Sequence, residues 1–206
     1  MKIWKLFGLV VLAIVIAGAI YATRLIRRGF SAREQPSHLE RAIARTVRNL
    51  AIPSSARSEE NPWKGLDTPE NLKEAREHFA DHCATCHAND GSGKTEIGQN
   101  LYPKPPDMRL AETQNLTDGE LYYIIENGVR LTGMPAWGDP HFIEQDDDSW
   151  KLVLFIRHLP HLTPDDEKDM EHFNPKGEME IEEEQEQPSN GGGASNAPAD
   201  GQHHHH

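Results

Sequence analysis

The sequence predicts a mainly α-helical protein with an N-terminal transmembrane helix and a disordered, acidic C-terminal tail. Three observations lead to this fold class. Residues 6–22 form an uninterrupted apolar run of 17 residues. Capped segments between residues 37 and 160 repeat apolar side chains every three or four positions, which is the spacing of an amphipathic helix. Residues 163–206 carry 12 Asp or Glu against 2 Lys or Arg, and their apolar content is too low to offset the entropy of ordering.

Residues 1–29 contain the apolar run and are expected to form a membrane anchor. As a helix, the run spans roughly 26 Å at about 1.5 Å per residue, just enough to cross a hydrocarbon core of about 30 Å. A cleaved signal peptide, with its small residues at 17–19, is the alternative. We favour the anchor because Arg24, Arg27 and Arg28 follow the run at once. The sequence there lacks the flanking residues typical of the N-terminus of a mature, cleaved protein.

Residues 30–62 form a connector that contains one predicted helix. Ser37 can cap this helix. Its apolar residues recur at helical spacing: Leu39, Ile43, Val47 and Leu50. Two interpretations stay open. The helix either packs on the domain that follows it or docks on the membrane surface or a partner subunit.

A second helix is predicted from Pro69 to about Asp81. Thr68 is a good cap, and Pro69 suits the first helical position. The residues of its apolar face recur every three or four positions: Leu72, Ala75, Phe79 and Cys83. The helix should therefore place Cys83 at the site that residues 83–87 form.

Residues 83–87 read CATCH and contain the only two cysteines of the chain. This spacing is typical of a c-type haem attachment site. We expect Cys83 and Cys86 to hold one haem c covalently and His87 to bind its iron as proximal ligand. A zinc site is less favoured because no second ligand pair stands at zinc-finger spacing. A thioredoxin-like pair would need a preceding strand, and a disulfide here would close a very small ring.

Met134 is the best candidate for the second axial ligand of a six-coordinate iron. It lies in a loop rich in glycine and proline, residues 131–138, which can hold a thioether in place outside a helix. Methionine paired with histidine is an established ligand set for haem iron. The less favoured candidates are Met108, which is expected to pack on the haem, Met170 and Met179 in the charged tail, and His141, His158 and His161 for a bis-histidine site.

Two further helices are predicted between residues 117 and 160. Thr117 and Glu120 form a capping box ahead of the first, which Gly128 ends. Residues 146–148 are three aspartates at the start of the second, where the helix dipole favours negative charge. Pro160 ends that helix.

On these motifs the chain resembles a monohaem class I c-type cytochrome of the membrane-anchored form. The resemblance covers about residues 66–162 and rests on residues 83–87, on residues 133–137 and on helices in the expected places. It implies a class I cytochrome c fold around one covalent haem. We place this haem domain at residues 63–162.

The resemblance also implies specific contacts. Phe79 and Phe155 should meet where the helix before the haem motif crosses the C-terminal helix, with Ala75 standing where the family often has glycine. His87 should donate its other ring N–H to a proline carbonyl, which fixes the ring. The prolines in range are Pro103, Pro105 and Pro106, and spacing alone does not choose among them. Trp137 either hydrogen-bonds a haem propionate or covers the haem edge.

Charge is segregated along the chain, whose formal net charge is −12. Residues 1–62 carry 10 Lys or Arg and 4 Asp or Glu, whereas residues 63–162 carry 9 and 17. An acidic haem domain argues against a nucleic-acid partner. It predicts redox partner proteins with a basic docking face. The run from His203 to His206 is either native or the remnant of a tag.

These features together predict a membrane-anchored electron carrier in a respiratory chain, with no catalytic residues of its own. The flanking positive charges do not set its orientation. We expect a single pass through the cytoplasmic membrane with the haem domain on the periplasmic side, because the family attaches haem there. The alternatives are an electron-transfer subunit of a larger membrane oxidoreductase complex, and a haem-based ligand sensor or peroxidase.

Overall fold

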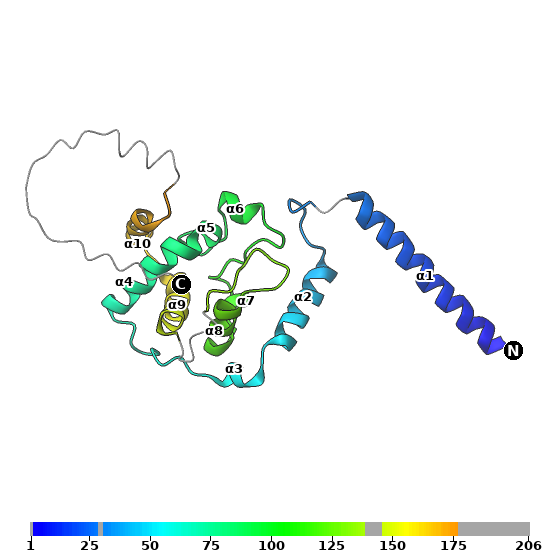
Figure 1. Ribbon diagram of the computed structural model, residues 1–206, viewed down its shortest axis with the longest axis horizontal. Helices are drawn as coiled ribbons and strands as arrows, with labels where there is room; N and C mark the ends of the chain where they lie inside the picture. Colours follow the sequence, from blue (N-terminus) through cyan, green and yellow to red (C-terminus); the bar gives the residue numbers. More distant parts are fainter. Residues whose placement is uncertain (1, 29–30, 139–145, 177–206) are drawn as a thin grey trace, which may run out of the picture.

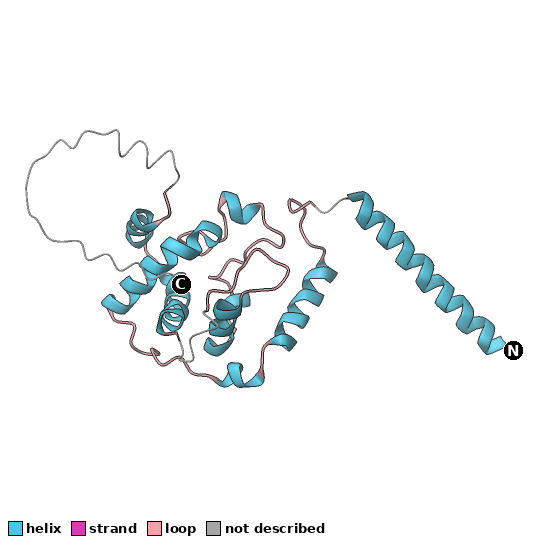
Figure 2. Cartoon of the chain, viewed as in Figure 1, coloured by secondary structure: helices cyan, strands magenta, loops and turns pink. Residues whose placement is uncertain are grey.

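The computed structural model describes residues 2–28, 31–138 and 146–176 (Figure 1). Throughout these ranges the regular structure is helical, with no strand, which confirms the predicted mainly α fold (Figure 2). The elements in chain order are α1 (Lys2–Arg28), α2 (His38–Ala51), α3 (Ser54–Ser58), α4 (Pro69–His78), the π-helical turn η1 (Phe79–Cys83), α5 (Ala84–His87), α6 (Glu96–Gln99), α7 (Ala111–Gln114), α8 (Asp118–Asn127), α9 (Asp147–His158), the 3-10 turn η2 (Leu159–His161), α10 (Pro164–Met170) and the 3-10 turn η3 (Glu171–Phe173).

Helix α1 stands apart from the rest of the chain in Figure 1. Its segment Ile3–Arg27 is 25 residues long and contains an 18-residue window with a mean hydropathy of 2.5, and none of this window is buried against the protein. A helix of that length and composition can cross a bilayer. The N-terminal segment is therefore consistent with a single-pass membrane anchor, longer than the 17-residue run that defines it in the sequence.

The core forms where α4 crosses α9. The rings of Phe79 and Phe155 meet with centroids 5.1 Å apart and planes tilted by 54°, and both side chains are fully buried. Tilted aromatic pairs of this kind stabilise a core beyond the area they bury. Ala75 lies one turn before Phe79 and is also buried, so its methyl group is accommodated at the crossing. The predicted aromatic contact is thus present.

Helix α8 packs beside α9 and starts at the predicted capping box. The Thr117 hydroxyl accepts from the Glu120 N–H, and the Glu120 carboxylate accepts from the Thr117 N–H. Tyr122 stacks on the fully buried Trp150 of α9 with ring centroids 4.1 Å apart. Arg157 of α9 bonds Asp118 at the start of α8, at 2.9 Å from Nε and 2.7 Å from Nη2. These contacts fix α8, whose far end carries the loop of Met134.

The connector between the anchor and the haem domain is shorter than predicted. Ile52 and Ala56 are buried, and Ala56 on α3 packs so closely on Gly119 of α8 that no Cβ would fit there. The buried Asn61 donates to the carbonyl of Trp150 at 2.9 Å. The predicted domain boundary at residue 62 is therefore wrong, because residues 52–61 already pack on the domain.

The predicted start of the disordered tail at residue 163 is also wrong. Thr163 begins α10 with a capping box to Asp166, which in turn pairs with Arg76 of α4. Met170 at the end of α10 is fully buried in the core. One buried side chain and one cap thus order a segment whose average composition is acidic. The residues after 176, including Met179 and the terminal histidines, lie outside the described ranges.

We expect Met170→Ala to lower the free energy of unfolding by about 2–5 kcal/mol, the usual cost of truncating a buried methionine. Chemical denaturation of the full chain, followed by circular dichroism, measures the change. Lys168→Ala on the same helix is the matched control because Lys168 is exposed. Equal stability of the two variants would contradict the packing of α10 on the core.

Candidate haem site

An apolar cavity of about 220 Å³ lies between α5, α8 and two loops, residues 101–108 and 129–137. Cys83, Cys86 and His87 contribute to its lining, and Met134 lines it from the second loop. The fold therefore brings the four predicted haem residues to one cavity.

The cavity wall that carries the cysteines is a continuous run of helix. Phe79–Cys83 forms a π-helical turn that continues α4 into α5, so the helix predicted to end near Asp81 reaches His87. Ala88 then takes a positive φ of 63° and stops the helix. Helix α6 backs this turn, because Gly98 lies so close to the Cys86 carbonyl that a Cβ would clash with it. The CATCH motif is thus fixed by the preceding helix α4 and by α6, which packs against it.

Burial sets the protonation of these three side chains. It lowers the pKa of His87 to about 4, so the imidazole is neutral at neutral pH, the form that binds a metal. Burial, and secondarily the neighbouring Cys86, raises the pKa of the Cys83 thiol to about 12. Burial also raises the pKa of Cys86. A reactive dithiol needs lowered thiol pKa values, so the redox-pair alternative is disfavoured.

The chemistry of the cavity fits an iron porphyrin. Its lining is mostly apolar, and the imidazole of His87 contributes to that lining. Both cysteines are free thiols in the fold. Within the described residues, no three His, Cys, Asp or Glu side chains lie close enough to share a metal ion, which does not favour the zinc alternative.

A proline-rich loop closes the cavity beside His87. Pro103, Pro105 and Pro106 all line the cavity. Gly93, at φ +70°, lies so close that a Cβ there would approach the Pro105 carbonyl oxygen to 2.8 Å. The proline carbonyl bond that the resemblance implies is not formed in this structure, because His87 Nδ1 has no partner.

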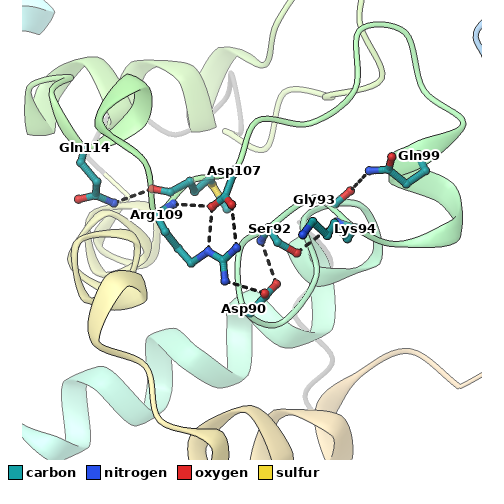
Figure 3. Close-up of polar contacts among 9 residues, drawn as sticks. Asp90, Ser92, Gly93, Lys94, Gln99, Asp107, Arg109 and Gln114 are labelled. Atoms are coloured by element: carbon teal, nitrogen blue, oxygen red, sulfur yellow. Dashed lines mark hydrogen bonds and ion pairs between the residues drawn. The ribbon is translucent and has the colours of Figure 1, made fainter. Parts of the chain in front are cut away.

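Arg109 ties the C-terminal end of this loop to the segment that follows the haem motif (Figure 3). Its guanidinium bonds both oxygens of Asp107, at 2.8 and 2.7 Å, and reaches Asp90 at 2.8 Å. The backbone N–H of Met108, between Asp107 and Arg109, donates to the Gly91 carbonyl at 2.9 Å. Asp90 and Gly91 follow the haem motif closely, so this cluster sets where the loop returns to the cavity.

The Met134 loop is fixed to the end of α8 by its backbone. Gly128 has a positive φ of 63°, and a Cβ there would come within 2.5 Å of the Pro135 backbone. The Val129 N–H donates to the Met134 carbonyl at 3.2 Å, and the Trp137 N–H donates to the Ile125 carbonyl at 3.1 Å. Only glycine fits position 128 without strain. The thioether therefore sits on a tightly held turn, as the sequence pattern predicts.

The alternatives to Met134 as second axial ligand lie in different parts of the structure. Met108 is buried and lines the same cavity, so it stays a packing candidate on the haem. His158 and His161 line a different hollow, beyond α9. Met170 lies in the core, away from the cavity lining. His141 and Met179 lie outside the described residues.

Residues 70–156 match the profile of a family described as cytochrome C oxidase, cbb3-type, subunit III. The matched segment contains the haem motif, the proline-rich loop and Met134. These residues form a c-type cytochrome domain. No curated protein matches the sequence. The cytochrome domain thus accounts for the cavity through haem binding, and its function is haem-based electron transfer.

Three polar side chains of the cytochrome cavity were not predicted from the sequence. His82 lines it and contacts Trp137 edge-on, with ring centroids 5.5 Å apart. Lys104 lines it from the proline-rich loop, and Arg48 lines it from α2. A haem carries carboxylate groups, and cationic side chains at the edge of an apolar cavity can bind them. No sequence pattern indicates that Arg48 lines the cavity, because it lies 35 residues before Cys83.

The Arg109 cluster predicts a specific dependence of cytochrome stability on pH. The pKa of Asp107 is lowered, chiefly by its hydrogen bonds from Arg109. A lowered carboxyl pKa stabilises the fold above the ordinary pKa, and that contribution is lost as the pH falls through the folded-state value. We expect Arg109→Gln to lower the melting temperature at neutral pH, with a difference from the unchanged protein that shrinks below about pH 4.

Melting curves by circular dichroism at a series of pH values measure this effect. Lys73→Gln is the control, because it breaks only an exposed pair with Glu77 and should change little at any pH. A difference for Arg109→Gln that stays constant from neutral pH to acid would show that the arginine acts by packing instead.

Proposed function

We propose that this protein is a membrane-anchored electron carrier that holds one haem covalently and passes single electrons in a respiratory chain. One observation carries the proposal. The structure lines a single apolar cavity with both cysteines of the CATCH motif, with the following histidine and with Met134. The chain holds no other cysteine, so it offers one attachment motif and one haem.

Each of the four residues has a distinct role in this proposal. Cys83 and Cys86 would hold the porphyrin by thioether bonds, and His87 would bind the iron. Met134 would supply a second ligand, a thioether that favours reduced iron and raises the potential. The bound haem supplies the one-electron change. The apolar lining excludes water, and the neutral His87 keeps an uncharged nitrogen available to the metal.

The anchor places this chemistry at a membrane. Helix α1 has the length and composition of one span. We propose that the domain faces the periplasm, on the ground that c-type haem attachment takes place on that side in the family. Its acidic surface favours redox partners with a basic docking face, since complementary charge raises the rate of encounter.

A second candidate function is the electron-transfer subunit of a larger oxidase complex. The observation that favours it is the family match, since the family is described as a subunit of a cytochrome c oxidase. Both functions use the same haem and the same ligands. Copurification of further subunits with the intact chain from membranes in mild detergent would distinguish the complex from a free carrier.

We expect the purified protein to show one reversible one-electron transition in a redox titration followed by visible spectra. Met134→Ala should abolish the sulfur-to-ferric charge-transfer band and lower the midpoint potential, because the iron loses a thioether ligand that favours the reduced state. Met108→Ala is the matched control, as its sulfur lines the same cavity. Loss of the band in Met108→Ala and its retention in Met134→Ala would reverse the ligand assignment. Pigment that acid acetone extracts would contradict covalent attachment.

The position of Arg48 in the cavity lining gives a further prediction. We expect Arg48→Gln to lower the midpoint potential, because a positive charge near the haem favours the less positive, reduced state. Spectroelectrochemical titration measures the change. Arg41→Gln is the control, since Arg41 lies on the same helix but does not line the cavity. Identical potentials for both variants would place Arg48 outside the influence of the haem.

A further inference from the structure

Helix α2 exposes a continuous apolar stripe. It is 14 residues long, starts at a complete capping box on Ser37, and has no buried residue. Its four large apolar side chains are mostly exposed: Leu39 by 67%, Ile43 by 54%, Val47 by 59% and Leu50 by 80%. These exposures contradict the interpretation in which the apolar face packs on the haem domain. A stripe of this kind on a capped helix usually meets another apolar phase.

The opposite face of α2 already has a partner. Arg45 pairs with Glu112 of the haem domain at 2.5 Å, and Arg48 lines the haem cavity. At about 100° per residue, the arginines lie on the side of the helix away from Ile43 and Val47. The basic face of α2 is therefore turned to the acidic domain, which leaves the apolar stripe turned away from it.

The chain itself limits what can cover the stripe. Nine residues separate the end of α1 at Arg28 from the start of α2 at His38. Fully extended, they reach about 30 Å. If α1 spans the bilayer, α2 cannot leave the neighbourhood of the membrane surface, and Figure 1 shows α2 along the edge of the haem domain nearer to α1. Arg24, Arg27 and Arg33 flank this short connection, which suits anionic lipid headgroups.

We infer that α2 lies in the interface of an anionic bilayer, with Leu39, Ile43, Val47 and Leu50 among the acyl chains and its arginine face against the haem domain. The inference rests on α1 being a membrane span and is independent of the electron-transfer proposal. Because Arg48 of the same helix lines the cavity, this arrangement holds the haem site next to the membrane surface. It favours electron exchange with a membrane-embedded partner over a freely diffusing one.

Photocrosslinking of the full chain tests this inference without using any cysteine. The photoreactive residue p-benzoylphenylalanine is placed at Ile43 in one preparation and at Ala44 in another, and each is reconstituted into vesicles of phosphatidylcholine and phosphatidylglycerol. Ala44 is adjacent and exposed, but it lies about 100° around the helix. A third preparation carries the residue at Leu12, in the middle of α1, and reports insertion of the anchor.

We expect lipid adducts at position 43, detected by mass spectrometry, at several times the yield at position 44. Equal yields at the two positions, or adducts at position 43 only to a second copy of the chain, would overturn the inference. Absence of lipid adducts at position 12 would overturn it as well, because the connection to a membrane span would then be lost. None of these outcomes depends on haem content, so each can be distinguished from failure of the electron-transfer proposal.

Discussion

The contact of Phe79 with Phe155 is the interaction on which the rest of the cytochrome domain depends. It locks α4 across α9, and α4 runs without interruption into the turn that carries Cys83, Cys86 and His87. Phe79 also lines the haem cavity. The same ring therefore builds the protein core and one wall of the site, so the position of the haem motif is set by core packing rather than by a flexible loop.

Two further walls of the cavity are loops, and each loop is fixed by close backbone contacts. Gly93 and Gly128 sit at positive φ against proline residues, where any side chain would clash. Arg109 closes the proline-rich loop with paired, charge-assisted hydrogen bonds, which are the stronger and more directional kind. The two loops are thus irregular in backbone but tightly held, which suits a site whose residues would bind a cofactor in two oxidation states.

Charge segregation has a structural use in this chain. The basic N-terminal part meets the acidic domain through α2, where Arg45 pairs with Glu112. An exposed ion pair of this kind adds little stability by itself, but it orients α2 on the domain. That orientation brings Arg48 to the cavity and leaves the apolar stripe outward. One amphipathic helix can therefore connect the anchor, the membrane surface and the haem site.

The sequence by itself determined the features that depend on neighbouring residues. The CATCH spacing, the caps at Ser37, Thr68 and Thr117, and the apolar run of the anchor are short-range patterns, and each is found in the structure. Helical spacing alone predicts that Phe79 is buried, whereas its contact with Phe155 came from the resemblance to class I c-type cytochromes.

Only the tertiary structure decided features that join distant segments. Arg48 reaches the cavity, Met170 fills the core and residues 52–61 belong to the domain because helices far apart in the chain pack together. The acidic composition after residue 163 did not predict α10, because an average over many residues does not show the cap at Thr163 or the buried side chain of Met170. Local pattern fixes which helices form, whereas burial and the lining of a cavity depend on how those helices cross.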